Sequence, residues 1–166
     1  KGAENKYINK ALNDSNPDIR ITGIRIARER GLDIIPFLKK MVKDTDSGVR
    51  RECAIALRHN NSPQAPALWT ELAKQHNGED RWYLESLGLA LDKQQDKFFG
   101  AWLDVVGSDW DTPGGRDIIW RSRSSKTSEL LVKILLDKKT KEAEKPRYIR
   151  ALDFQSGHEK DAAVMK

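Results

Sequence analysis

The chain has 166 residues, 38% of them hydrophobic and 33% charged, with a net charge of +5. This length fits one domain or a compact array of repeats, and 5 Trp, 4 Phe and 3 Tyr argue against disorder. No apolar run reaches the ~18 residues that span a membrane, so no membrane span is expected. Residues 1–60 and 121–166 each carry a net +5, whereas residues 61–120 carry −5. A nucleic-acid groove usually needs a continuous basic stripe, so the acidic middle disfavours nucleic acid as a partner.

Signals for helix starts and stops occur at regular intervals along the chain. Asn16 and Pro17 open a first predicted helix, and Gly31 ends it. Asp33 can cap the next helix, with Pro36 in its first turn. Further signals are the turn at 44–48, the cap Ser62 with Pro63 in the first turn, the stop at Asn77 and Gly78, the cap Asp80, and the start at Thr112 and Pro113.

Apolar residues between these signals recur at spacings of three and four, as amphipathic helices require. The clearest faces are Leu38, Met41 and Val42; Leu68, Trp69 and Leu72; and Phe98, Trp102, Leu103 and Val106. About eleven helices are expected.

A 30-residue shift reveals an internal repeat. NPDIRITGIRIAR (16–28) overlays DSGVRRECAIALR (46–58). The β-branched residue, Ile19 or Val49, is expected to pack inward, and the arginine that follows, Arg20 or Arg50, to reach an acidic side chain of a neighbouring repeat. Looser copies occur at 80–91, 113–123 and 145–154. Alternating helices at this period predict an all-α fold: an α-solenoid of stacked antiparallel helix pairs in a right-handed superhelix.

DSGVRRECAIAL resembles a HEAT repeat, whose pattern reads roughly D-x-x-V-R-x-x-A-x-x-A-L. Cys53 stands where that pattern has Ala, and because both residues are small the fold expectation is unchanged. The solenoid is therefore expected to be HEAT-like and to occupy residues 1–166 as a single repeat domain.

The later copies are similar to a narrower group. DRWYLESLGLAL (80–91), FFGAWLDVVGSDWDTPGGRDIIWRSRS (98–124) and RYIRALDF (147–154) resemble the HEAT-like segment of large exported bacterial proteins. Those proteins combine a sugar-dehydrogenase-like β-propeller with such a segment and often a c-type haem domain. The resemblance implies a periplasmic or cell-surface location, and a spacer or interaction module rather than an active centre. The abrupt ends of the sequence agree with a piece of a longer protein.

Eight residues are candidates for binding a protein partner or a neighbouring domain of the same chain: Arg20, Arg50, Arg81, Glu85, Trp110, Arg116, Arg121 and Arg123. For Trp120, Arg121 and Arg123, contact with nucleic acid competes with a structural interpretation, which is favoured. In that interpretation Trp120 packs between repeats, and the arginines pair with acids such as Asp117 or Asp104 or bind preceding carbonyls.

Two other stretches combine aromatic with polar residues. Asp80, Arg81 and Trp82 match the residue types with which a HEAT-like DNA glycosylase holds a damaged nucleotide. A helix cap at Asp80, with Trp82 and Tyr83 filling a contact between repeats, is the simpler interpretation. Trp110 lies in a loop-like stretch, where it either binds a peptide or glycan or folds back over the helix ends.

Metal and nucleophile chemistry has little support. His158 and Glu159 form a single His–Glu pair, whereas a di-iron centre needs several, and His59 and His76 have no adjacent acid in the sequence. Cys53 is expected to be a buried, inert thiol. The run 138–141 is expected to be a solvated loop.

The sequence therefore predicts a monomeric, non-catalytic interaction or spacer module without a cofactor. Nucleic-acid binding or DNA base repair on the same scaffold is the alternative function.

Overall fold

The structure is a computed structural model, and it describes residues 2–165. This part of the chain is all helical, with eleven α-helices and two short 3-10 helices and no strand. The predicted fold class and number of helices are thus confirmed. In chain order the elements are α1 (Gly2–Leu12), α2 (Pro17–Glu29), α3 (Ile35–Met41), α4 (Ser47–Ala56), α5 (Ala65–Ala73), α6 (Arg81–Ala90), α7 (Gln95–Val106), η1 (Gly107–Trp110), α8 (Pro113–Arg121), α9 (Thr127–Leu136), η2 (Glu142–Glu144), α10 (Lys145–Leu152) and α11 (His158–Val164).

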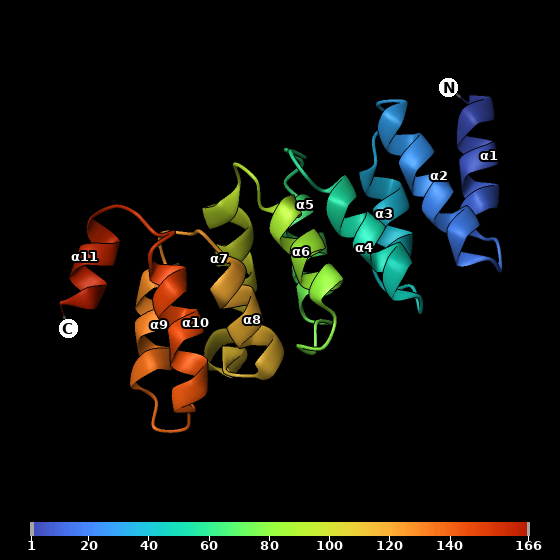
Figure 1. The fold of residues 1–166 in the computed structure, drawn as a ribbon. Helices are drawn as coiled ribbons and strands as arrows, with labels where there is room; N and C mark the ends of the chain where they lie inside the picture. Colours follow the sequence, from blue (N-terminus) through green and yellow to red (C-terminus); the bar gives the residue numbers. More distant parts are fainter. Residues whose placement is uncertain (1, 166) are drawn as a thin grey trace.

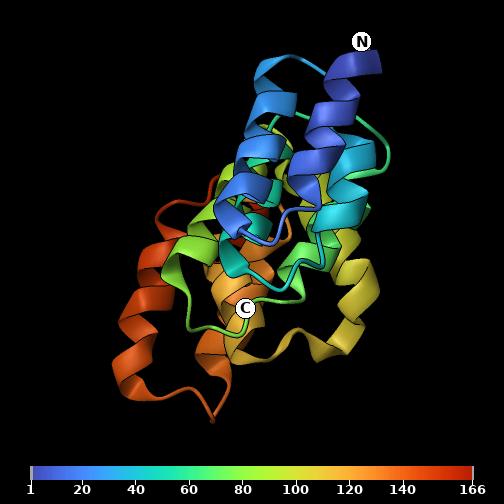
Figure 2. The same cartoon turned by 90° about the vertical axis from the view of Figure 1, so that its right-hand side faces the viewer.

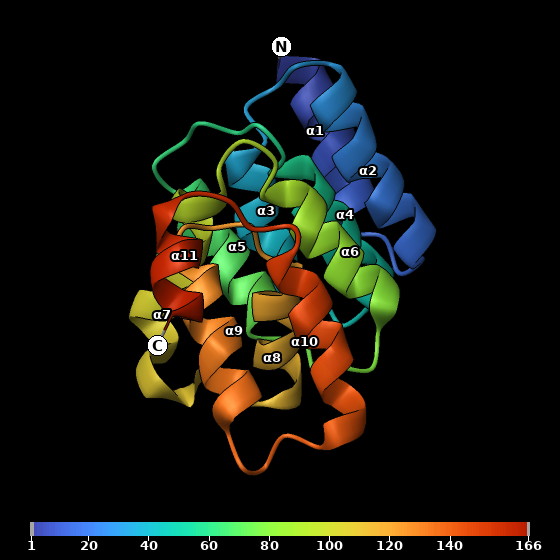
Figure 3. The same cartoon turned by 60° about the vertical axis from the view of Figure 1, so that its left-hand side comes forward.

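The helices form an α-solenoid that runs from α1 at one end to α11 at the other (Figure 1). Helices α2, α4, α6, α8 and α10 contact one another in sequence and form what we call the even layer. The remaining helices form the odd layer, in which α5 packs on α7 and α9 on α11. Figure 2 looks onto the end that carries α1 and α2, and Figure 3 brings forward the end that carries α9, α10 and α11.

Local sequence fixes where the even-layer helices start. Asn16, Asp46, Asp80 and Thr112 are the N-caps of α2, α4, α6 and α8, and each side chain accepts a hydrogen bond from a backbone N–H of the first turn. These bonds satisfy donors that the first turn of a helix otherwise leaves unpaired. These caps recur in α2, α4, α6 and α8, whose starts line up along one edge of the even layer (Figure 1), whereas α10 has no side-chain cap.

A continuous apolar core lies between the two layers. Trp69 is fully buried, donates its indole N–H to the carbonyl of Leu87, and meets Phe98 edge to face. The three apolar faces predicted from the sequence all contribute to this core, with Leu103 and Val106 at its margin. Cys53 is also fully buried, as predicted.

Two sequence-based expectations about packing are wrong. Pro63 does not lie in the first turn of a helix, because α5 begins at Ala65 and has Pro66 there instead. Ile19 does not pack inward as its repeat equivalent Val49 does, and is 42% exposed. Val49 lies on α4, which packs on α2, whereas no even-layer helix precedes α2 in the described residues.

Candidate interaction surface

The recurrent arginines fill equivalent places in successive repeats. Nη1 of Arg20 donates to the backbone carbonyls of Asp14 and Ser15 at 2.9 and 3.0 Å. Thirty residues later, Nη1 of Arg50 donates to the carbonyls of Asp44 and Thr45 at 2.6 and 3.0 Å. Each arginine therefore closes the turn that precedes its own helix.

The same arginines also reach the next repeat, but with different partners. Arg20 makes a two-pronged ion pair with Asp44, with both N–O distances 2.8 Å. Arg50 was expected to meet an acid as well, but its guanidinium lies over the ring of Tyr83, 5.5 Å from the centroid. The expectation is therefore confirmed for Arg20 and wrong for Arg50, where an aromatic ring takes the place of the carboxylate.

Arg116 is the equivalent arginine in the fourth copy of the repeat, residues 113–123, and it also joins a turn to the next repeat. It bonds Asp111 in the turn before α8, and Asp137 and Thr140 after α9, at 2.5, 2.7 and 2.8 Å. A single guanidinium with five donors in a fixed plane suits such a three-way contact. Arg116 thereby holds the turn before α8 to the loop that follows α9.

Arg121 and Arg123 are both engaged within the molecule. Arg121 pairs with Glu85 of α6 at 2.9 Å and runs over Gly88, where a Cβ would lie 2.6 Å from its Cζ. Arg123 donates to the carbonyls of Trp120 and Ser122 and covers the ring of Phe154. The structural interpretation is confirmed for both, although Asp117 and Asp104, the acids expected from the sequence, are not their partners.

Trp120 packs against the core, and two guanidinium groups lie close to its ring. The guanidinium of Arg81 is 5.0 Å from its ring centroid, and that of Arg147 is 4.4 Å away. Arg81 in turn pairs with Glu85 at 2.6 Å. Three consecutive even-layer helices are joined at this point, so the predicted packing role of Trp120 is confirmed.

A polar cluster centred on Asp117, which shares Arg147 with the Trp120 contact, was not predicted. His76, from the loop after α5, lies 3.1 Å from Asp117 of α8, which also pairs with Arg147 of α10 at 2.5 Å. The His76 ring is stacked on Tyr83 and its side chain is 1% exposed. Sequence spacing could not reveal the cluster because its members are 30 and 41 residues apart.

Pairing keeps these carboxylates ionised. Burial raises the pKa of Asp117, but its hydrogen bonds with His76 and Arg147 lower the pKa by more, so it lies below its usual value. The pKa of Glu85 is likewise raised by burial and lowered further by Arg121 and Arg81. The carboxylates therefore act as fixed anions that hold neighbouring helices together.

Trp82 is the aromatic residue that this surface presents to solvent. It was expected to fill a contact between repeats together with Tyr83, but it is 72% exposed while Tyr83 is 3% exposed. Positions one residue apart on a helix point in different directions, so a Trp–Tyr pair cannot be buried on one side. Trp110, by contrast, is partly buried and packs against the core, next to the start of α8.

A family model described as HEAT repeats matches residues 5–88, about half of the chain. The chain belongs to the HEAT-repeat family. No curated protein matches the sequence. HEAT repeats are scaffolds for protein interaction: stacked helix pairs bury their apolar faces against one another and expose an extended surface. Of the eight candidate residues, Arg81 is the most exposed, whereas Arg20 and Arg116 are largely covered, and their role toward a partner remains a prediction.

Other chemistry in this HEAT-repeat chain is limited. Among residues 2–165 there is no group of three or more His, Cys, Asp and Glu placed to hold a metal ion. His158 is 89% exposed at the start of α11 and faces a single carboxylate, that of Glu159. Burial raises the pKa of the Cys53 thiol, so this cysteine stays protonated. None of the helices in the described range is long and apolar enough to cross a membrane.

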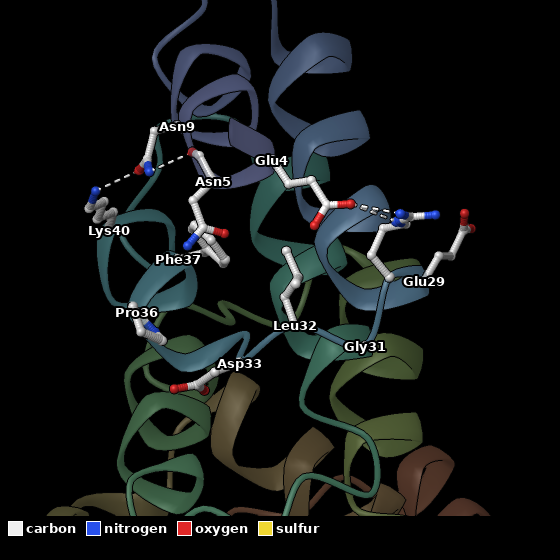
Figure 4. A pocket seen from close by; sticks show the side chains of 11 residues that line it. Glu4, Asn5, Asn9, Glu29, Gly31, Leu32, Asp33, Pro36, Phe37 and Lys40 are labelled. Atoms are coloured by element: carbon white, nitrogen blue, oxygen red, sulfur yellow. Dashed lines mark hydrogen bonds and ion pairs between the residues drawn. The ribbon is translucent and has the colours of Figure 1, made fainter. Parts of the chain in front are cut away.

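A pocket of about 920 Å³ opens between α1, the end of α2 and α3 (Figure 4). On one side Glu4 pairs with Arg30, and on the other Lys40 donates to the side-chain oxygen of Asn9. Glu4 is thus paired within the HEAT-repeat stack, and the lining residues are not arranged in a set that suggests a reaction.

Proposed function

We propose that this HEAT-repeat chain is a non-catalytic interaction or spacer module of a larger exported bacterial dehydrogenase-like protein. In this proposal the even layer around Trp82 docks a protein partner or a neighbouring domain. The exposure of Trp82 is the observation that carries the proposal.

A tryptophan that is 72% exposed leaves a large apolar surface in water. Tryptophan and arginine dominate the residues that supply most of the binding energy at protein interfaces. Here Trp82 follows Arg81, and α6 also carries the half-exposed Leu89. The surrounding ion pairs are internal, so the surface is rigid before a partner arrives, which lowers the entropic cost of binding.

Photo-crosslinking tests the docking surface. A photoreactive amino acid would replace Trp82 in the full-length protein in its native host, and in a matched variant it would replace Val105. Val105 is 59% exposed but lies on α7 in the odd layer. We expect crosslinks to a protein or to another domain from position 82 and not from 105. Equal yields from both positions, or none from 82, would contradict the proposal.

The flanking gene sequence tests the context separately. The proposal expects an export signal and a β-propeller upstream, and a CxxCH haem-attachment motif downstream. Flanking regions that encode none of these would remove the dehydrogenase context and leave only the HEAT-repeat scaffold.

A further inference from the structure

The recurrent arginines of α2 and α4 use one edge of the guanidinium group in the same way. Nη1 of Arg20 and Nη1 of Arg50 each donate to two backbone carbonyls of the preceding turn. In Arg20 the other edge, formed by Nε and Nη2, holds the carboxylate of Asp44, with both N–O distances 2.8 Å. Two parallel N–H donors on one edge are the arrangement that fits a carboxylate best.

The corresponding edge of Arg50 holds no carboxylate. Within residues 2–165 Arg50 makes no ion pair, and its Nε is buried without a hydrogen-bond partner. The ring of Tyr83, 5.5 Å from the guanidinium, supplies an aromatic face and not a pair of acceptor oxygens. A buried N–H without an acceptor is costly, so this edge of Arg50 is incomplete in the chain alone.

The sequence explains why the acid is missing at Arg50. Asp44, the partner of Arg20, lies in the turn after α3 and accepts the backbone N–H two residues later. Asp137, a partner of Arg116, does the same directly after α9. In the turn after α5 the residue that makes this bond is Asn77. A neutral amide therefore stands where the other repeats carry an acid.

Arg50 and Asn77 line one cleft of about 530 Å³. The cleft is formed by the start of α4, the turn after α5 and the start of α6, in the interior of the stack and not at either end (Figure 1). Trp82, the centre of the proposed docking surface, lines the same cleft. A partner that contacts Trp82 is thereby brought next to Arg50.

The acids that line this cleft are engaged elsewhere. Asp80 caps α6 and lies 3.9 Å from Arg51. Glu79 is exposed and accepts a hydrogen bond from the side-chain amide of Asn77. The positive charge of Arg50 is thus left without a paired carboxylate at the cleft.

We propose that the cleft at Arg50 binds a carboxylate, which an Asp or Glu side chain of the docking protein segment supplies. This carboxylate accepts from Nε and Nη2 of Arg50, as Asp44 does from Arg20. The source of the acid rests on the proposed docking at Trp82, whereas the binding of a carboxylate by Arg50 does not. A dianionic phosphate would be repelled more strongly by the nearby acids of the cleft, so a singly charged carboxylate suits it better.

Titration of the 166-residue chain with a blocked peptide of four glutamates tests the site, followed by NMR of the arginine Nε–H signals. The Arg50 signal should shift and saturate, while the Arg20 signal should stay in place because Asp44 occupies that edge. The peptide of four glutamines is the neutral control, and inorganic phosphate is the competing anion. An Arg50 signal that ignores the glutamate peptide, or that saturates at lower phosphate than peptide concentration, would overturn the proposal.

Two variants separate a specific site from attraction to net charge. Arg50→Lys keeps the charge but lacks the paired donors, and Asn77→Asp supplies the missing acid from within the chain. Each should weaken binding of the glutamate peptide roughly tenfold. Lys97→Gln, on the exposed side of α7, changes the net charge by the same amount as Asn77→Asp but should alter binding less than about twofold at moderate salt.

Circular dichroism would confirm that the three variants remain helical. Unchanged affinity in either site variant, or an equal loss in Lys97→Gln, would contradict a carboxylate site at Arg50.

Crosslinking in the full-length protein distinguishes the carboxylate site from the docking surface itself. With the photoreactive residue at position 82, Asn77→Asp should lower the crosslink yield at least about fivefold. Full yield in Asn77→Asp would leave the docking surface standing and remove the carboxylate site. If neither protein crosslinks from position 82, the docking surface is wrong, and the shift of the Arg50 signal still decides whether the cleft binds a carboxylate.

Discussion

At the residue scale, many charged side chains in this protein form ion pairs between helices, and these pairs leave them less available to a ligand. The clearest case is Asp117, whose carboxylate binds His76 and Arg147 and is only 12% exposed. Removing one member of a buried charged cluster leaves the others without a partner, which costs more than the cluster contributes as a whole.

Replacing Asp117 with Asn should lower the free energy of unfolding at neutral pH by about 2 kcal/mol, because the guanidinium of Arg147 loses its counter-charge. The pKa of Asp117 is lowered in the folded state, so its stabilising effect is present above the unfolded pKa of about 3.9 and is lost as the pH falls through the folded value. The difference in free energy of unfolding between wild type and variant should therefore become smaller below about pH 4.

Urea denaturation at a series of pH values measures this difference in free energy of unfolding. Asp104→Asn serves as the control, because Asp104 is exposed and makes no ion pair or side-chain hydrogen bond within residues 2–165. If the difference in free energy of unfolding between wild type and Asp117→Asn stays constant down to strongly acidic pH, the carboxylate is not stabilised as an anion.

At the scale of the helix, the N-caps define the repeat. Asp46 and Asp80 each accept a backbone N–H three residues later, at 3.1 and 2.9 Å. Replacing either with Ala should lower the free energy of unfolding by about 1 kcal/mol. Gln64→Ala is the matched control, because Gln64 is the N-cap of α5 but makes no side-chain capping bond. Chemical denaturation measures all three, and an equal loss for Gln64→Ala would argue against capping as the cause.

Two glycines inside helices should respond in opposite ways to substitution by Ala. At Gly114 in α8 a Cβ would overlap the carbonyl oxygen of His76, whereas at Gly100 in α7 the nearest atom, Nζ of Lys126, would be 3.9 Å away. We expect Gly114→Ala to destabilise the fold by about 2 kcal/mol or more, and Gly100→Ala to stabilise it by about 0.5 kcal/mol. Thermal unfolding compares the two, and a stable Gly114→Ala would show that the loop at His76 yields freely.

The sequence predicts the positions of the helices better than it predicts whether a single side chain is buried or exposed. Caps such as Asn16 and Thr112 are local signals, so the helix starts follow from neighbouring residues alone. Exposure is not local: Ile19 and Val49 occupy the same repeat position but differ in having a helix beside them. The cluster around His76 depends on three separate segments meeting, which no single-sequence pattern contains.

At the scale of the whole molecule, the arginines belong to the stack and are not arranged as a basic groove. Arg20, Arg116, Arg121 and Arg123 all have internal partners, and the middle third of the chain is acidic. A short DNA duplex should therefore fail to bind even at low salt, as measured by fluorescence anisotropy. Binding that fades steeply as salt rises would instead support phosphate contacts and the nucleic-acid alternative.

The central claim is that ion pairs between repeats add to the apolar core in joining successive helices of the even layer, and the Arg121–Glu85 pair between α8 and α6 tests it most directly. A double-mutant cycle with Arg121→Gln and Glu85→Gln, measured by urea unfolding, should give a coupling of about 1 kcal/mol. The more exposed pair between Lys43, in the turn after α3, and Glu71 of α5 is the control, with an expected coupling below about 0.5 kcal/mol. A coupling for Arg121 and Glu85 no larger than that of the control would contradict the claim.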